Sequence, residues 1–335
     1  MTPQAVDGVA RVLVIVMGLL FGSFLNVVIA RVPLGESIVK PRSRCPRCGR
    51  QLTWFENIPV LSWLALRGRC RGCHEPISWR YPLIELLTAA LFFACQRRFG
   101  WTPELVLALV FVLLLVPLSF IDLEHWILPQ ELTWPGIAAG VALSAPLGMP
   151  RLIDSVIGAV AGFLVFWAME WVGEKIFKKE ALGAGDKDLL ALIGAFLSWK
   201  ALLGVIFLSS LQGAVVGSVM LLIYGRAGPA PEEDADSAPA PTPAADARAS
   251  LEAAPGPMAT PESSETALPG PEATRGEGEA ARPGEEEEED DWVPGPTNIP
   301  FGPWLSVAAL EVLLLGPWLS EVLPAPMNVL LTGLR

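Results

Sequence analysis

Histidine is nearly absent from this chain of 335 residues, which contains only His74 and His125. Two histidines this far apart do not suggest a histidine-rich metal centre or a histidine-based catalytic triad. The sequence also lacks a G-x-S-x-G nucleophile elbow, a Walker A loop and a G-x-G-x-x-G dinucleotide fingerprint. These absences argue against the enzyme classes that depend on those motifs. No nucleic-acid partner is expected.

Cysteine is also scarce, with five residues in the chain. Four form two CxxC pairs and the fifth, Cys95, stands alone in an apolar run, which is not the pattern of a small disulfide-stapled secreted domain. Hydrophobic residues are abundant instead, at 52% of the chain, and several runs approach the roughly 20 residues that cross a bilayer. We therefore expect an all-α polytopic membrane protein in contact with membrane lipids. The eight expected spans are residues 9–30, 82–99, 103–121, 131–148, 152–172, 188–199, 201–224 and 301–323.

Charges in the loops indicate how these spans are oriented. The first span is too long for an ordinary signal-peptide core and no small-residue cleavage site follows it, so we expect a retained membrane helix. Residues 31–81 carry ten Lys/Arg and three Glu, which predicts that this loop is cytoplasmic. Alternating spans then place Asp122 and Asp186 at the cytoplasmic face. Arg97 and Arg98 would face outward, against the same tendency.

The acidity of the chain comes from one segment. Residues 226–291 hold 18 Asp/Glu and 4 Arg, a net charge of −14, whereas the whole chain has −11, so the remainder carries about +3. The segment 226–297 is rich in Pro, Ala, Gly and Glu, a composition that buries too little apolar surface to fold. We expect a disordered cytoplasmic insert, which serves either as a tolerated linker or as a docking segment.

Four cysteines lie in the first cytoplasmic loop: Cys45, Cys48, Cys70 and Cys73. Each CxxC pair places two thiolates on one tight turn, and two such turns can close a tetrahedral Zn²⁺ site. The gap of 21 residues between the pairs is slightly above the usual zinc-ribbon spacing. Gly49 and Gly72 supply the backbone freedom that such turns need. We expect a structural zinc that organises the loop, with a redox dithiol or unliganded cysteines as the alternatives.

Two aspartates stand at the ends of apolar runs. Asp122 follows the run Phe111–Ile121, and Asp186 follows Gly183 and Gly185, which let the backbone bend and a substrate strand approach. Ionisable residues at membrane spans are costly, so each is a functional hypothesis. Two carboxylates held close share a proton, so one acts as a base and the other as an acid in peptide hydrolysis by activated water.

Each aspartate has an ordinary alternative role. An acidic residue at the end of a span is often an interfacial anchor. Glu124 and Asp188 are rival carboxylates, and on a helix Asp188 would point about 200° away from Asp186. Lys187 and Asp188 could instead form a solvated charge pair. His125 lies near Asp122 in the sequence and could tune its acidity.

Six motifs follow one another along the chain: Phe21-Gly22-Ser23-Phe24-Leu25-Asn26-Val27-Val28 with Arg31 and Pro33; the cysteine loop with Trp54 and Asn57-Ile58-Pro59; Arg80-Tyr81-Pro82 with Glu85; Asp122 with Leu128-Pro129; Gly183-Ala184-Gly185-Asp186; and Ile299-Pro300-Phe301-Gly302-Pro303. In this order they resemble the type IV prepilin peptidases, which are bifunctional leader peptidase/N-methyltransferases and GxGD-type intramembrane aspartic proteases. The resemblance covers nearly the whole chain except the acidic insert, which is not a usual feature of the family.

The resemblance implies that Asp122 and Asp186 are the catalytic pair, with Gly183 and Gly185 in the active-site loop. The implied reaction removes the short, positively charged leader of type IV prepilins or type II secretion pseudopilins on the cytoplasmic side of the bacterial inner membrane. The resemblance further implies N-methylation of the new N-terminus with S-adenosylmethionine, and Glu85 is the candidate residue for binding this cofactor. The family commonly has a Lys two residues after the second aspartate, whereas Lys187 follows it directly here.

This interpretation divides the chain into four parts. They are an N-terminal helix, cysteine loop and second helix with the methyltransferase region (1–99), the aspartic peptidase helices (100–225), the acidic insert (226–297) and the last membrane helix with the C-terminus (298–335). Two other functions stay open at this point. A non-catalytic zinc-bearing scaffold of a pilus or secretion machine has no need for two aspartates at one membrane face, and a membrane thiol oxidoreductase requires the CxxC pairs to cycle.

Overall fold

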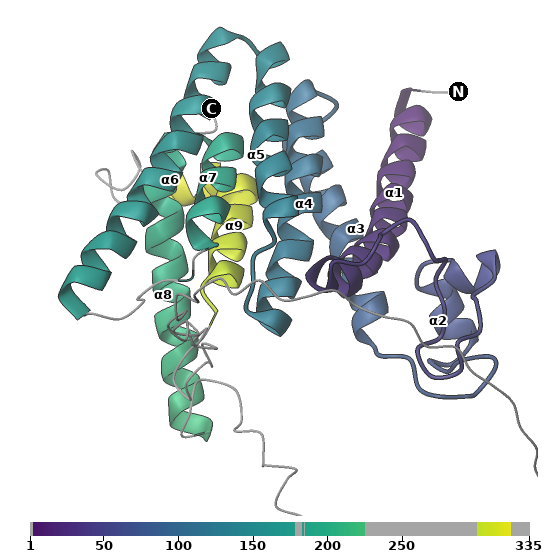
Figure 1. Cartoon of the computed structure of the whole chain (residues 1–335). Helices are drawn as coiled ribbons and strands as arrows, with labels where there is room; N and C mark the ends of the chain where they lie inside the picture. The colour runs from purple at the N-terminus through teal and green to yellow at the C-terminus, as the bar shows by residue number, and fades with distance from the viewer. Residues whose placement is uncertain (1–2, 178–182, 184, 225–299, 323–335) are drawn as a thin grey trace, which may run out of the picture. The chain divides into compact units, whose positions relative to one another are not determined.

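The chain forms a bundle of helices in the computed structural model, which describes residues 3–177, 183, 185–224 and 300–322 (Figure 1). Within these ranges the backbone forms helices and two isolated β-bridges but no named strand. The all-α fold expected from the sequence is therefore confirmed. The expected acidic insert, 226–297, lies outside the described residues.

The helices follow the apolar runs of the sequence. Short 3₁₀ turns at Val32–Leu34, Trp54–Asn57 and Ala145–Leu147 join some of them. The α-helices are α1 (Pro3–Arg31), α2 (Leu61–Ala65), α3 (Arg80–Phe99), α4 (Pro103–His125), α5 (Gln130–Ser144), α6 (Met149–Phe177), α7 (Asp186–Leu197), α8 (Trp199–Tyr224) and α9 (Gly302–Val322).

Four helical segments in the described part of the chain are long and apolar enough to cross a membrane: Val6–Leu34, Pro103–His125, Met149–Gly173 and Trp199–Ile223. The chain is thus a multi-pass membrane protein, but the count of eight spans is not confirmed. The expected spans at 131–148 and 188–199 are helices α5 and α7, with 15 and 12 residues. At 1.5 Å per residue, both are shorter than the roughly 30 Å of a bilayer core.

Helix α7 lies in the interior of the bundle. Every residue from Asp188 to Leu197 is buried, and α7 contacts α5, α6, α8 and α9 (Figure 1). A helix that is apolar on all sides is stable only when other helices surround it. Because α7 begins at Asp186, its fixed position also fixes where this aspartate stands.

Helices α6 and α7 touch through their backbones. A Cβ atom added to Gly158 would lie 2.1 Å from the carbonyl oxygen of Gly194, and one added to Gly194 would lie 2.1 Å from that of Gly158. Such contact requires glycine at both positions. At the C-terminal end of α7, Ser155 Oγ donates to the carbonyl oxygen of Ala195 at 2.6 Å, which satisfies a carbonyl that the helix leaves unpaired. Small residues and a hydroxyl therefore hold α7 against α6.

A similar contact joins α1 to α3. Added Cβ atoms at Gly18 and Gly22 would lie 2.5 Å and 2.6 Å from the Cα atoms of Ala89 and Glu85. Both helix pairs thus use a glycine every fourth residue, Gly18 with Gly22 in α1 and Gly158 with Gly162 in α6, the spacing that lets membrane helices approach closely. The contact fixes Glu85 next to the first helix.

Candidate functional site

Asp122 lies in the last turn of α4, and only 6% of its surface is exposed. The helix ends at Trp126, whose left-handed backbone (φ 58°) lets its N–H donate to the Asp122 carbonyl oxygen at 3.0 Å. On the side chain, Asp122 Oδ2 is buried and has no hydrogen-bond partner among the described residues. Burial of an unpaired carboxylate oxygen is costly, which is unlike the interfacial anchor that the sequence left open.

Asp186 is the first residue of α7 and is also 6% exposed. Its backbone N–H donates to the carbonyl oxygen of Gly183 at 3.0 Å. Gly183 is so close to the aspartate that an added Cβ would lie 3.4 Å from Asp186 Oδ2. Gly183 therefore lies beside the carboxylate of Asp186.

The segments that bear the two aspartates meet in space. Leu128, in the loop after Asp122, packs against Gly185, where an added Cβ would lie 2.6 Å from Leu128 Cβ. Gly302, the first residue of α9, contacts both α4 and α7. A Cβ atom added to it would stand 2.5 Å from Asp122 Oδ2 and 3.4 Å from Leu189 Cδ2. The end of α4 and the starts of α7 and α9 thus enclose one acidic site.

Gly185 has a packing role at this site. Its backbone is ordinary (φ −86°), so it is not needed for a left-handed turn; it is needed because Leu128 occupies the space of a side chain. The expectation that Gly183 and Gly185 let a substrate strand approach stays a prediction. Sequence reasoning did not assign a role to Gly302, although its motif in the last helix was a signal that this residue belongs to the site.

The rival carboxylates have other partners. Glu124 forms an ion pair with Arg80, at the start of α3. Asp188 is only 3% exposed, and the side chain of Trp134 hydrogen-bonds to it. The alternative of a solvated pair between Lys187 and Asp188 does not hold, since Asp188 is buried and Lys187 Nζ pairs with Glu170 Oε2 of α6 at 2.8 Å. His125 is exposed at the surface, unlike the buried Asp122.

The four loop cysteines form a second site, apart from the aspartates in sequence. Their Sγ atoms all lie within 4.8 Å of one another, and the Sγ atoms of Cys45 and Cys73 are 3.8 Å apart. A tetrahedral zinc with Zn–S bonds of about 2.3 Å has sulfur–sulfur distances of about 3.8 Å. The donor set therefore fits a four-thiolate zinc, and four protein ligands leave no open position for catalysis.

The two CxxC turns share a backbone hydrogen bond and a left-handed residue. Cys45 N–H donates to the Arg50 carbonyl, and Cys70 N–H donates to the Glu75 carbonyl, both at 2.9 Å. In each turn the residue after the second cysteine is left-handed: Gly49 has φ 69° and His74 has φ 58°. The prediction for Gly49 is confirmed. The prediction for Gly72 is wrong, because the left-handed residue of the second turn is His74.

The thiols of this cluster differ in acidity, since burial and the other thiols raise the pKa of Cys73 to about 11. Backbone N–H groups of Cys73 and Gly72 hydrogen-bond to Cys70 Sγ and lower the pKa of this thiol to about 6. A thiolate is the form that binds zinc. Close by in sequence, the hydrogen bonds from Arg50 and then Thr53 lower the pKa of Glu56 to about 2. Glu56 is only 6% exposed and ties the first CxxC turn to the 3₁₀ turn that follows.

A group of buried polar side chains lies where α1 and α3 meet the loop. Glu85 is 7% exposed, and its Oε2 accepts a hydrogen bond from the backbone N–H of Val60 at 2.7 Å. Val60 has φ 60°, which is strained for a β-branched residue. Asn26 is 4% exposed and donates to the Tyr81 carbonyl, while its Oδ1 is buried and has no partner among the described residues. Strained backbone and an unpaired acceptor are typical of functional sites.

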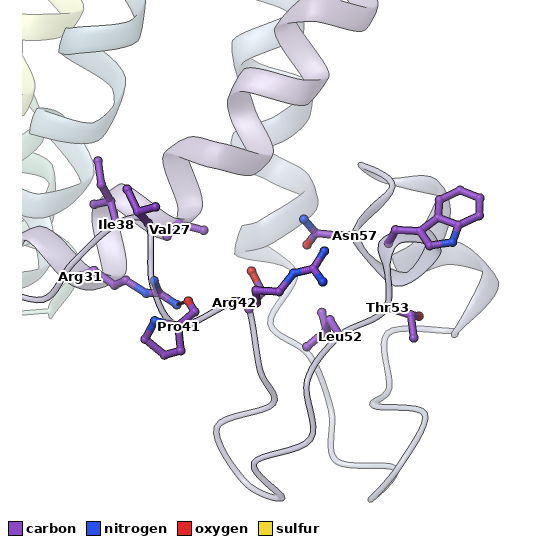
Figure 2. Close-up of a pocket in the computed structure, with 11 residues that line it drawn as sticks. Val27, Arg31, Ile38, Pro41, Arg42, Leu52, Thr53 and Asn57 are labelled. Atoms are coloured by element: carbon purple, nitrogen blue, oxygen red, sulfur yellow. Dashed lines mark hydrogen bonds between the residues drawn. The ribbon is translucent and has the colours of Figure 1, made fainter.

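A pocket of about 190 Å³ lies between the end of α1 and the loop (Figure 2). Arg31 is one of its lining residues, and its guanidinium donates to the carbonyl oxygens of Ser37 at 2.9 Å and Pro41 at 2.8 Å. The lining residues of the pocket are Val27, Arg31, Ile38, Val39, Pro41, Arg42, Ser43, Leu52, Thr53, Trp54 and Asn57.

Two family models match the chain. The model described as bacterial peptidase A24 N-terminal domain matches residues 16–99, and the model described as type IV leader peptidase family matches residues 109–218. The first range holds the cysteine cluster, Glu85 and the pocket, and the second holds both aspartates. No solved structure gives a significant match to the chain.

Curated relatives carry one common name, prepilin leader peptidase/N-methyltransferase. A protein of Myxococcus xanthus is 59% identical over 324 residues, which cover 96% of this chain and 95% of the relative. Proteins of Aeromonas hydrophila and Klebsiella pneumoniae are 44% and 43% identical, over 63% and 58% of this chain and 81% and 87% of the relatives.

The match to the Myxococcus protein is long enough to span the segment 226–297. This relative is therefore matched across the acidic insert, which the resemblance had marked as unusual for the family. The matches to the other two relatives cover a smaller share of the chain. Identity at this level over nearly the whole of both sequences decides the membership: the chain belongs to the type IV leader peptidase family.

Proposed function

We propose that this enzyme cleaves the leader peptide of type IV prepilins and type II secretion pseudopilins and then methylates the new N-terminus. The observation that carries the proposal is the meeting of the end of α4 with the starts of α7 and α9, where two aspartates are buried, in a chain that is 59% identical to a prepilin leader peptidase/N-methyltransferase. A scaffold has no use for such a pair, and the comparisons do not favour that alternative.

Asp122 and Asp186 are the catalytic pair in this proposal. Two adjacent carboxylates hold one proton between them, so one of them can accept a proton from a water molecule while the other donates a proton to the peptide. The water oxygen then attacks the carbonyl carbon, and the amine leaves with a proton once the C–N bond breaks. Burial supports this role, since it keeps bulk water from both carboxylates.

The orientation follows from the loop charges and from one ion pair. We place the active site at the cytoplasmic face of the bacterial inner membrane, because the loop 31–81 carries ten Lys/Arg and three Glu. The Arg80–Glu124 pair joins the end of this loop to the helix turn that bears Asp122. This contact supports a common membrane face for the loop and the aspartates.

The division of labour follows the chain. Residues 1–99 are the methyltransferase region and 100–225 the peptidase helices, while 298–335 completes the peptidase site through Gly302. The cysteine cluster would hold a structural Zn²⁺ that joins the two CxxC turns, and S-adenosylmethionine would supply the methyl group. Glu85 is the candidate to face that cofactor or the amine, because its carboxylate is buried in this part of the chain and accepts a hydrogen bond from Val60, in the cysteine loop.

The experiment uses the purified full chain, a prepilin and S-adenosylmethionine, with mass spectrometry of the products. We expect loss of the leader, followed by the gain of one methyl group on the new N-terminus only when S-adenosylmethionine is present. An uncut prepilin would contradict the peptidase function, and a cut but unmethylated product would contradict the methyltransferase function. A thiol oxidoreductase would instead oxidise and reduce its CxxC pairs without cutting the prepilin.

A further inference from the structure

The two residues that follow Asp186 are tied to two different helices. Lys187 Nζ forms an ion pair with Glu170 Oε2 of α6 at 2.8 Å, and the indole N–H of Trp134 in α5 donates to the Asp188 carboxylate. Consecutive side chains on a helix point about 100° apart, so the two links reach two neighbours of α7, which contacts both α5 and α6 (Figure 1). The first turn of α7 is therefore held from two sides.

The ion pair spans the start of α7. The backbone contacts between α6 and α7 run in opposite directions along the two helices, Gly158 with Gly194 and Gly162 with Leu190. Extended further, this antiparallel register places Glu170 about one helical turn beyond the first residue of α7. Side chains of a helix lean toward its N-terminus, which is the direction in which Lys187 extends to reach Glu170. The lysine side chain therefore runs alongside the turn that carries Asp186.

Both links are largely shielded from water. The side chains of Lys187 and Glu170 are 24% and 19% exposed, and Asp188 is only 3% exposed. Glu170 lies within Met149–Gly173, one of the segments long and apolar enough to cross a membrane, where a charged group without a partner is costly. A lysine in the first turn of a helix also meets the positive end of the helix dipole, which disfavours it. The ion pair offsets both costs and connects α6 to the start of α7.

We propose that Lys187 and Asp188 are positioning residues, which hold the first turn of α7 in the orientation that aims the Asp186 carboxylate at the substrate. The inference rests on the proposed peptidase function. On a helix, Asp186 points about 100° from Lys187 and about 200° from Asp188, so neither link uses the side of the helix that bears Asp186. A displacement of about 1 Å can cost about 10²-fold in rate, so a loose first turn slows the reaction although every catalytic group is present.

The first test measures kcat and KM for prepilin cleavage by the full chain in detergent. Lys187→Met removes the charge but keeps the length of the side chain, and Glu170→Gln removes the other half of the pair. Each is expected to lower kcat at least about tenfold and to leave KM within about threefold, because the substrate contacts remain. Lys187→Arg keeps the ion pair and is expected to retain kcat within about threefold. The double variant is expected to lose no more than the worse single variant, since both changes break one contact.

The second link is tested by the same kinetics. Trp134→Phe removes the indole donor but keeps an aromatic ring on α5, and it is expected to lower kcat at least about tenfold. Asp188→Asn keeps an oxygen that accepts the indole N–H and is expected to retain kcat within about threefold. Glu124→Gln is the matched control, because its ion pair with Arg80 does not involve α7. Thermal unfolding of each variant sets an assay temperature well below the midpoint, so that unfolded protein does not account for a loss.

Three results would overturn the inference. Unchanged kcat in Lys187→Met and Glu170→Gln would show that the pair does not position Asp186. A higher KM with unchanged kcat would make the pair part of substrate binding, and a lower unfolding temperature with unchanged kcat would make its role structural alone. If Lys187→Met does not fold, Glu170→Gln and Trp134→Phe decide by the same criteria. These failures leave the peptidase function standing, whereas an unmodified chain that does not cut prepilin would reject that function itself.

Discussion

Gly302 lies so close to Asp122 that a Cβ atom on the glycine would stand 2.5 Å from Asp122 Oδ2. The contact joins the first residue of the last described helix to the last turn of α4. A side chain at this position would displace the Asp122 carboxylate, and the same glycine also faces Leu189, one turn after Asp186 begins α7. Helix α9 therefore closes the acidic site between the two other helices.

Substitution of Gly302 by alanine is expected to lower the rate of prepilin cleavage at least about tenfold, because a misplaced catalytic group costs that much or more. Gly316→Ala is the matched control on the same helix, since an added Cβ there meets no atom within 4 Å. Cleavage rates of both variants in detergent give the comparison. Equal rates in the two variants would contradict the role of α9 in the site.

Much of this site was predictable from the sequence. The charge of the loops placed Asp122 and Asp186 at one face, and the CxxC spacing predicted the cysteine cluster, because both signals are local in sequence. The contact of Gly302 with Asp122 was not predictable, since it depends on how α9 packs after a long insert. The pairing of Lys187 with Glu170 of α6 was not predictable either, because only tertiary packing brings these two residues together.

The glycine contacts between helices had a sequence signal that spacing alone could have revealed. Gly158 and Gly162 stand four residues apart in a membrane helix, as do Gly18 and Gly22. The spacing does not predict which residues of another helix these glycines contact. The contact with Gly194 exists because α7 is short, apolar on all sides and buried in the bundle.

Gly158→Ala is expected to destabilise the protein by about 1–3 kcal/mol, because the added methyl group would overlap the backbone of α7 and force the helices apart. Thermal unfolding in detergent measures the loss, and cleavage should fall with it because α7 carries Asp186. Gly8→Ala is the control, since Gly8 has no atom within 4 Å of an added Cβ. A Gly158→Ala protein as stable as the control would show that the helices do not touch.

Glu124 provides a test of the choice between carboxylates. Its pair with Arg80 is about one-third exposed, and pairs of this kind contribute at most about 1 kcal/mol. Glu124→Gln is therefore expected to keep the cleavage rate within about fivefold of the unmodified enzyme. A loss as large as that of an Asp122 variant would make Glu124 a catalytic residue and contradict the assignment.

The cysteine cluster is expected to bind one zinc ion per chain. Cys70→Ser should lose the metal and lower the yield of folded loop, because a site with three thiolates no longer closes the two turns. Cys95→Ser is the matched control, as Cys95 is buried in α3 outside the cluster. Metal content by atomic emission measures both. Full zinc content in Cys70→Ser would remove Cys70 from the ligand set.

The catalytic pair itself is tested most directly by Asp122→Asn and Asp186→Asn, each assayed for prepilin cleavage with zinc content as a check of folding. Asparagine keeps the size of the side chain but cannot take up or release the proton that the reaction needs. Each variant is expected to lose at least about 10³-fold in cleavage rate, the scale seen when one member of a catalytic unit is removed. A folded Asp122→Asn or Asp186→Asn protein that cuts prepilin at the rate of the unmodified enzyme would contradict the account.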